Sequence, residues 1–257
     1  MQNIQEDINF LEYPTWVISN KQTKNRLLQE KDGGTYEITC PEGLPTRFDK
    51  IVLYFLLYKS FQQENTLAIS TTRYEIAKNV LLQDKNFSQS KYNRIMLALK
   101  RWQSTYIRFE SVFLHREKDK TSPYAAIKYF SILDSVVLNK TTNELTATFN
   151  EHYMAQLVNS QFHRTINFHE YKLLTRPVSA RLYEILLKHL FVEKIWCVDI
   201  TELGEKLTLE KISYPSHILA AIKPAINDIN LNTTMAFTFD FDKKRSLGIF
   251  TKKSSYA

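Results

Sequence analysis

Short polar and basic side chains gather between residues 88 and 101, in a pattern that suits contact with nucleic acid. Lysine and arginine can bind phosphate groups, whereas serine, asparagine and glutamine can reach the edges of bases. Apolar residues recur through the same stretch at helical spacing, so many of the polar residues share one face. The candidate contacts in this first group are Ser88, Gln89, Ser90, Lys91, Asn93, Arg94, Lys100 and Arg101.

The longer stretch Ser70–Thr105 must position these residues. It contains two short amphipathic patterns joined by a polar link; Ser70 is a candidate N-cap of the first, and Ser88 or Ser90 of the second. This order is typical of a helix-turn-helix. An ordinary two-helix corner with a solvated basic face is the alternative, since helix-turn-helix sequences follow no strict code. Leu97 points away from its own helix's core, which indicates packing on the N-terminal segment or a dimer contact.

The distribution of charge favours a polyanionic partner. The chain has 34 Lys or Arg and 27 Asp or Glu, a net charge of +7. Residues 70–120 hold eleven of these cations and only five of the acids, so nearly all the excess lies there. Nucleic acid is the most common partner of such a basic surface. Only five glycines occur, which argues against nucleotide-binding folds built on glycine-rich loops.

Other features exclude membrane and secreted classes. No apolar run approaches the ~18–20 residues of a membrane span, and the first ten residues lack the pattern of a signal peptide. Cys40 and Cys197 are isolated and fit no metal or redox motif, which suits a reducing compartment. We therefore expect a cytoplasmic protein without a metal or cofactor.

The elements around the helix-turn-helix follow the order of a winged helix. A buried helix at Asp49–Phe61 and a short strand at Leu67–Ile69 come before it, and two β-rich runs come after it. The charged tip between these runs, His115–Lys120, is the predicted wing. Its candidate phosphate contacts are Arg116, Lys118 and Lys120.

The second half of the chain repeats this order in architecture, not in letters. Helical patterns interrupted at Pro177, a strand at Ile195–Ile200, a short helix capped by Thr201 and a longer helix are followed by a hairpin. The candidates at the start of the longer helix are Lys211, Ser213, Tyr214, Ser216, His217 and Lys223. The candidates at the hairpin tip are Lys243, Lys244 and Arg245.

The sequence therefore predicts an α+β protein with two tandem winged-helix domains. We expect residues 1–45 to pack on the first domain as an N-terminal segment, and residues 46–150 to form that domain. Residues 151–165 are the expected linker helix, capped by Asn150, and residues 166–257 the second domain.

Two segments resemble a known family. The segment Leu173–Leu190, LLTRPVSARLYEILLKHL, resembles the opening of the second winged helix in the replication initiators of iteron-type plasmids. Within it, Arg181–Leu186 carries the family's Arg-Leu-Tyr-Glu-Leu-Leu-like pattern. The run Phe10–Pro14 resembles the entry segment of the replication initiator protein A group. The resemblance extends in order over nearly the whole chain, although its motifs are short.

The resemblance implies a function that composition and spacing do not. Members bind repeated double-stranded origin sequences, called iterons, through two tandem winged helices. A monomer initiates plasmid replication, a homodimer represses its own promoter, and the protein contacts the host helicase and host initiator. The second domain usually makes the principal major-groove contacts, while the first helps to form the dimer and touches adjacent DNA.

Other function classes fit the sequence less well. A rolling-circle replication nuclease needs a metal-binding His-hydrophobic-His motif, but His163 and His169 are separated by five residues. No zinc-protease, Walker or nucleophile-elbow motif occurs, so we predict that the chain is not an enzyme. A tandem winged-helix transcription regulator without a replication role remains the alternative. A module whose winged helices bind protein is less consistent with the charge of residues 70–120.

Overall fold

The computed structural model describes residues 3–19, 24–31, 33–81, 87–117, 120–123, 127–159 and 162–253. The chain divides into two compact units: unit 1 is Met1–Asn9 with Lys21–Phe168, and unit 2 is Phe10–Asn20 with His169–Ala257. Residues 10–20 thus group with unit 2, whereas we expected all of residues 1–45 to pack on the first domain. The expected linker, residues 151–165, groups with unit 1.

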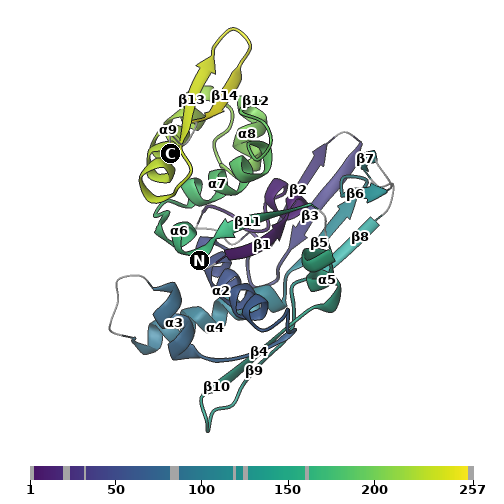
Figure 1. Cartoon of the computed structure of the whole chain (residues 1–257), viewed down its shortest axis with the longest axis vertical. Coiled ribbons are helices and arrows are strands. Elements are labelled where there is room, and N and C mark those ends of the chain that lie inside the picture. Colours follow the sequence, from purple (N-terminus) through teal and green to yellow (C-terminus); the bar gives the residue numbers. More distant parts are fainter. Residues whose placement is uncertain are drawn as a thin grey trace. The chain divides into compact units, whose positions relative to one another are not determined.

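Unit 1 contains a winged helix built from three helices and a three-stranded sheet (Figure 1). Its elements are α2 (Arg47–Gln62), β4 (Ala68–Thr72), α3 (Arg73–Val80), α4 (Gln89–Gln103), β9 (Leu133–Leu138) and β10 (Glu144–Phe149). The strands are antiparallel in the order β4-β10-β9. The predicted apolar stripe of α4 is buried at Ile95, Leu99 and Trp102, and the Trp102 indole N–H donates to the Asp49 carbonyl at 2.6 Å.

Helix ends in unit 1 follow local capping chemistry. Thr72, not Ser70, is the N-cap of α3, and its hydroxyl accepts the Glu75 backbone N–H at 3.0 Å. Ser88 is the N-cap residue of α4. The helix α5 (Glu151–Asn159) follows Asn150, whose side-chain oxygen accepts the Tyr153 backbone N–H at 3.2 Å. The last two agree with the prediction.

The predicted position of the wing in unit 1 is wrong. The hairpin that pairs with β4 is β9–β10, which has its tip near Asn139–Asn143 and extends past α3 and α4 in Figure 1. The described residues of the predicted tip, 115–117 and 120, belong instead to a separate hairpin of β6 (Leu114–Glu117) and β7 (Lys120–Pro123). The physical reason is that the second predicted β-rich run contains two strands, Ile127–Ser131 and Leu133–Leu138, which lie in different sheets.

The other strand of that run is β8, which lies in a four-stranded sheet absent from the predicted scheme. The sheet has the order β2-β3-β5-β8. Its strands are β2 (Arg26–Lys31), β3 (Gly34–Thr39), β5 (Tyr106–Glu110) and β8 (Ile127–Ser131). Tyr36, Ile38, Ile107 and Phe109 alternate along the two central strands and are buried, so this sheet has its own apolar face.

Unit 2 contains the second winged helix, with the same topology. Its elements are α7 (Pro177–His189), β12 (Ile195–Asp199), α8 (Ile200–Lys206), α9 (Pro215–Asn232), β13 (Phe237–Asp242) and β14 (Leu247–Lys252), preceded by α6 (Phe168–Leu173). The strand order β12-β14-β13 is equivalent to β4-β10-β9. Asp199, not Thr201, caps α8: its carboxylate accepts the Thr201 and Glu202 backbone N–H groups at 2.8 and 3.1 Å.

A short repeat in letters also exists, contrary to our expectation. Ile8–Tyr13 reads INFLEY and Ile166–Tyr171 reads INFHEY, so five of six letters agree. The preceding strands β1 (Asn3–Asp7) and β11 (His163–Asn167) pair antiparallel, with Glu6 opposite Arg164. Because these two residues stand at equivalent places in the two copies, the ladder has local two-fold symmetry about them.

Close packing of α8 on the chain that leads into α9 depends on Gly204. A Cβ atom there would lie 2.8 Å from Ile212 Cγ2 and 3.0 Å from Ile218 Cδ1. Gly204→Val should therefore lower the free energy of unfolding by roughly 1–3 kcal/mol, because it overpacks this contact. Urea denaturation measures the change. Ala220→Val, on the exposed side of α9, is the control, and an equal effect of the two substitutions would contradict the packing role.

Candidate nucleic-acid interface

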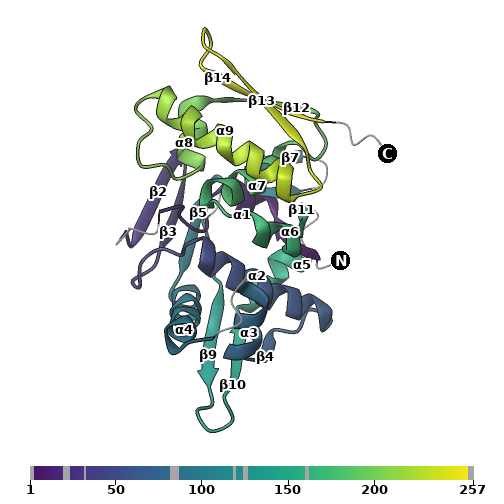
Figure 2. The same ribbon diagram turned by 90° about the vertical axis from the view of Figure 1, so that its left-hand side faces the viewer.

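The recognition helix of unit 2 is α9, which lies beside the β13–β14 hairpin (Figure 2). Its apolar side is buried at Ile218, Ile222 and Ile229. The predicted contacts at its start are all exposed: Lys211, Ser213, Tyr214, Ser216 and His217. The rings of Tyr214 and His217 meet edge to face with centroids 5.6 Å apart. A row of hydroxyl and ring groups is therefore exposed at the start of α9; that these groups contact bases stays a prediction.

The wing of unit 2 presents three exposed cations on an ordered turn. Lys243, Lys244 and Arg245 are exposed. The Asp242 carboxylate accepts the backbone N–H groups of Lys244 and Arg245 at 2.9 and 3.3 Å, which fixes the turn. The cations are thus held on a backbone of defined shape.

An open hollow of about 410 Å³ lies between α9 and β13. Lys223 and Asn227 line it from the helix, and Lys253 lies at its rim beyond the last strand. The side-chain amide of Asn230 ties the helix to the strand, since it donates to the Phe237 carbonyl at 2.9 Å and accepts the Phe237 N–H at 2.8 Å. Lys223 was among the predicted contacts, whereas Asn227 and Lys253 were not. They could be identified only once β13 was known to lie beside α9.

The recognition helix of unit 1 is α4. Its exposed residues are Ser88, Gln89, Ser90, Asn93, Arg94, Leu97 and Lys100, while Lys91 and Arg101 are half-buried. The Ser88 and Ser90 hydroxyl groups lie 2.8 Å apart, and the Gln89 amide donates to Asn93 at 2.9 Å. Leu97 is 39% exposed, so it stands on the same outer face as the polar residues.

Three of the predicted phosphate contacts in α4 have partners inside unit 1. The Arg101 guanidinium lies 3.0 Å from the buried Asp49 carboxylate and donates to the Glu42 carbonyl at 3.2 Å. Lys100 pairs with the Glu42 carboxylate at 2.8 Å. The basic excess of this stretch is therefore partly structural.

Arg94 is the third of these cations. Its guanidinium lies 3.9 Å from the centre of the Phe48 ring, an arrangement in which the ring face attracts the cation. Although Arg94 is partly exposed, its guanidinium loses some of its contact with water there, which lowers its pKa, and the nearby Asp49 carboxylate opposes this effect. The sequence could not show these partners because Asp49 and Phe48 lie more than 40 residues earlier in the chain.

Three predicted contacts remain, Arg116, Lys118 and Lys120. Arg116 is in β6 and Lys120 begins β7, while Lys118 lies outside the described residues. Arg116 and Lys120 are not on the hairpin that pairs with β4, so the structure does not support their assignment as wing contacts.

The true wing of unit 1 brings other polar residues beside the recognition helix. Lys140, Thr141, Thr142 and Asn143 at its tip are exposed. Arg73, at the start of α3, donates to the Asn143 side chain at 3.1 Å and lies 5.3 Å from the Tyr92 ring. The turn at Asn139–Asn143 was visible in the sequence. Its role was missed because an inserted hairpin precedes it.

Metal ligands and membrane-spanning helices were the two other kinds of feature to consider among the described residues. No group of His, Cys, Asp and Glu among them could hold a metal ion, and none of their helices is long and apolar enough to cross a membrane. Cys40 is buried and Cys197 exposed, and both are free thiols.

The chain is therefore a tandem winged-helix protein: each unit has a recognition helix with a polar face beside a hairpin. The chain belongs to the replication initiator protein A family, whose sequence model matches residues 5–213. This confirms the resemblance seen in the sequence.

Solved structures share the fold over nearly the whole chain. Domains 2 and 3 of RctB match with a TM-score of 0.62 and 11% identity, over 97% of this chain and 99% of that chain. The Pi initiator protein, solved in complex with iteron DNA, matches with a TM-score of 0.55 and 12% identity, over 99% and 98% of the two chains. No curated protein sequence matches significantly.

The ion pair of Arg101 predicts that this cation contributes more to the stability of unit 1 than an exposed cation of the same helix does. Arg101→Ala leaves the buried Asp49 without its cation and should lower the free energy of unfolding by roughly 2–4 kcal/mol. Lys100→Ala removes an exposed pair and should cost ~1 kcal/mol or less. Urea denaturation compares the two, and equal losses would show that Arg101 is not a structural cation.

Proposed function

We propose that this protein initiates plasmid replication by binding repeated sequences in the duplex DNA of an origin. Membership of the replication initiator protein A family supports this proposal. The observation that carries it is the pair of recognition helices, α4 and α9, each with an exposed polar face beside a hairpin wing. The similar Pi initiator protein was solved with iteron DNA, which fits the same mode of binding.

In this proposal α9 and its wing make the larger share of the contacts. Lys211, Lys223, Lys243 and Lys244 are exposed, and within the described part of the chain they form no ion pair. Arg101 and Lys100 of α4, by contrast, are held by acidic residues of unit 1. Cations without an internal partner can neutralise phosphates at little cost, and release of counterions then provides much of the affinity.

Base reading in the proposal comes from the starts of the two recognition helices. Ser213, Tyr214, Ser216 and His217 would enter one major groove, and Ser88, Gln89, Ser90 and Asn93 another. Hydroxyl, amide and ring nitrogen groups match the donor and acceptor patterns of base edges. Lys91 and Arg94 would serve phosphates or guanine beside them.

The family resemblance adds further proposals about assembly. A homodimer would repress the protein's own promoter, and the active protein would contact the host helicase and host initiator. Exposed Leu97 on α4 is a candidate dimer contact. Light scattering with and without DNA, together with a promoter reporter, tests these points.

Footprinting on the DNA beside the gene is the direct test of the function. Protection of direct repeats of about one to two helical turns each, in register, is the expected result. A footprint at a single operator without repeats would favour a transcription regulator instead. A lack of salt-dependent retention of duplex DNA would favour a protein-binding module.

The wing lysines provide a quantitative prediction. Lys243→Ala with Lys244→Ala should reduce the slope of log affinity against log salt by about 1–2, because each phosphate contact contributes ~0.9. Affinity should fall for all duplexes alike. The control is Lys194→Ala, an exposed lysine just before β12 at the other end of the sheet from the wing tip. An unchanged slope in the wing variant would remove these lysines from the interface.

His217 and Arg94 provide a second prediction about the two recognition helices. His217→Ala and Arg94→Ala should each weaken binding to an origin repeat. If His217 reads a base, its loss should cost roughly 1–3 kcal/mol on the cognate repeat and much less on unrelated duplex. Binding titrations at matched salt measure both. Wild-type affinity of both variants would contradict this choice of contacts.

A further inference from the structure

Residues 10–19 are built into unit 2 although they lie far from it in the sequence. This segment is here called the strap. Leu11 and Trp16 are completely buried, and Phe10 and Val17 nearly so, at 1% and 6% exposure. Apolar burial attaches the strap, but its polar contacts decide which part of unit 2 it holds.

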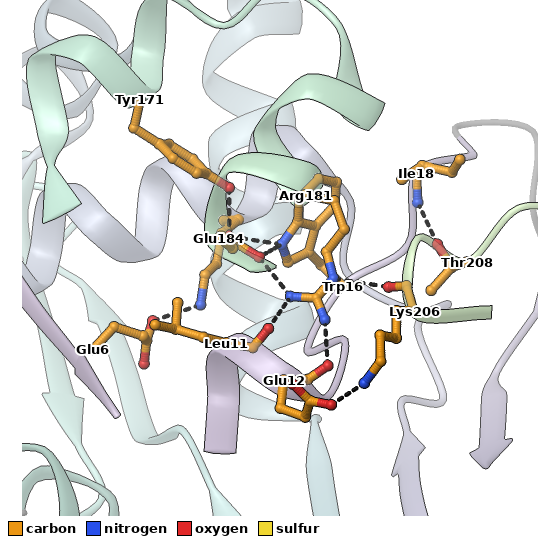
Figure 3. A network of polar contacts seen from close by, with 11 residues as sticks. Glu6, Leu11, Glu12, Trp16, Ile18, Tyr171, Arg181, Glu184, Lys206 and Thr208 are labelled. Atoms are coloured by element: carbon orange, nitrogen blue, oxygen red, sulfur yellow. Dashed lines mark hydrogen bonds and ion pairs between the residues drawn. The ribbon is translucent and has the colours of Figure 1, made fainter. Parts of the chain in front are cut away.

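Arg181 of α7 connects the strap to the helix-turn-helix (Figure 3). It is fully buried and donates to the carbonyls of Leu11 and Glu12 at 2.8 and 2.7 Å, where helix α1 (Ile8–Glu12) ends. Its Nε donates to the Lys206 carbonyl at 3.0 Å, where α8 ends. One guanidinium therefore satisfies the free carbonyls of two helix ends and joins them.

Glu184 balances the buried charge of Arg181. Its carboxylate lies 2.9 Å from Arg181 and accepts the Tyr171 hydroxyl at 2.7 Å. Both of its oxygens also lie 3.1 Å from the Trp16 indole nitrogen, which donates from the strap. A buried ion pair is tolerated only when its remaining donors and acceptors are satisfied, so the strap completes this pair.

A second set of contacts links the strap to the ends of α7 and α8. The Glu12 carboxylate accepts from Lys188 at 2.6 Å, lies 2.9 Å from His189, and contacts Lys206 as well. Burial lowers the pKa of Lys206 to about 8, and the Glu12 carboxylate is an ion-pair partner of this buried ammonium within unit 2.

The strap also reaches the turn between α8 and α9. The Ile18 backbone N–H donates to the Thr208 hydroxyl at 3.1 Å. Thr208 has φ +56°, in the left-handed region that β-branched residues rarely adopt. Its backbone N–H donates to the Glu205 carbonyl at 2.9 Å, so this conformation ends α8 and starts the turn. An unfavourable backbone conformation persists only where its surroundings hold it.

We infer that the strap positions the recognition helix of the second winged helix. It does so by holding Thr208, in the α8–α9 turn, in its left-handed conformation. In this role Trp16, Arg181 and Thr208 are positioning residues for DNA binding, and none of them needs to touch DNA. The inference builds on the proposed function, but its first effect is on the turn itself and can be measured without DNA.

The experiment uses the full chain with Trp16→Phe, which keeps an aromatic ring and removes both bonds to Glu184. Amide hydrogen exchange should rise at least tenfold at residues 207–209 and stay unchanged in α4. Affinity for a duplex selected by the wild-type protein from a random library should fall about tenfold, with an unchanged salt slope. The matched control is Trp102→Phe, which removes a buried indole bond in unit 1 and should leave the turn unchanged.

A rescue variant separates positioning from general loss of structure. Thr208→Gly removes the backbone strain, so the turn no longer depends on the strap. In the Trp16→Phe background it should restore affinity to within about threefold of wild type. If exchange rises uniformly through unit 2, or if Thr208→Gly gives no rescue, the strap is only packing and the inference fails.

The two levels of failure are distinguishable. If the wild-type protein selects no duplex, the proposed function fails, while the exchange pattern of Trp16→Phe still tests the strap. If DNA binds and residues 207–209 exchange as in wild type, the strap does not control the turn. Should Trp16→Phe not fold, Arg181→Lys is the second variant: it keeps the charge and loses the forked contacts to two helix ends.

Discussion

The buried pair of Arg181 and Glu184 sets the strictest physical constraint on unit 2. Both side chains are fully buried, and removing two charges from water is repaid only if every donor and acceptor finds a partner. Those partners come from the strap, α6 and the end of α8, which lie far apart in sequence. The pair therefore specifies how these segments must meet, more than it adds to stability.

The two winged helices have the same topology but differ in how their helices are capped and how their cations are paired. In unit 1 an uncharged threonine caps α3, and acidic residues hold the cations of the recognition helix. In unit 2 aspartate caps α8, and the wing cations remain exposed. A common topology thus supports a recognition helix in unit 1 whose last cations are held by acidic residues of its own unit, and a wing in unit 2 whose two lysines form no ion pair within the described part of the chain.

Much of this fold could be predicted because it depends on local signals. Apolar periodicity gave α4 and α9, proline placed the starts of α7 and α9, and the hairpin tips carry turn residues. The wing of unit 1 was misplaced because strands in different sheets look alike when they are adjacent in sequence. The role of the strap was missed because the partners of Trp16 lie about 170 residues away. The partner of Arg101 is 52 residues away, so its charge looked free.

The letter repeat was a signal that could have been found, since INFLEY and INFHEY are visible in the sequence. Its meaning depends on the pairing of β1 with β11, which sequence alone does not give. Each copy begins a strand followed by a helix, β1 with α1 and β11 with α6. The candidate residues in α9 could be identified from the sequence because amphipathic spacing predicts which face is exposed. The hollow beside β13 could not be predicted, because it depends on how the strand packs against the helix.

The discontinuous make-up of unit 2 limits how such proteins can exchange parts during evolution. The chain passes between the units at three places, after residues 9, 20 and 168. A single recombination event near residue 166 would therefore join the strap of one parent to the α8–α9 turn of another. Glu12, Trp16 and Ile18 would then face partners with which they had not been selected. Inheritance of a new DNA specificity by this route requires compatible residues at both ends of the gene.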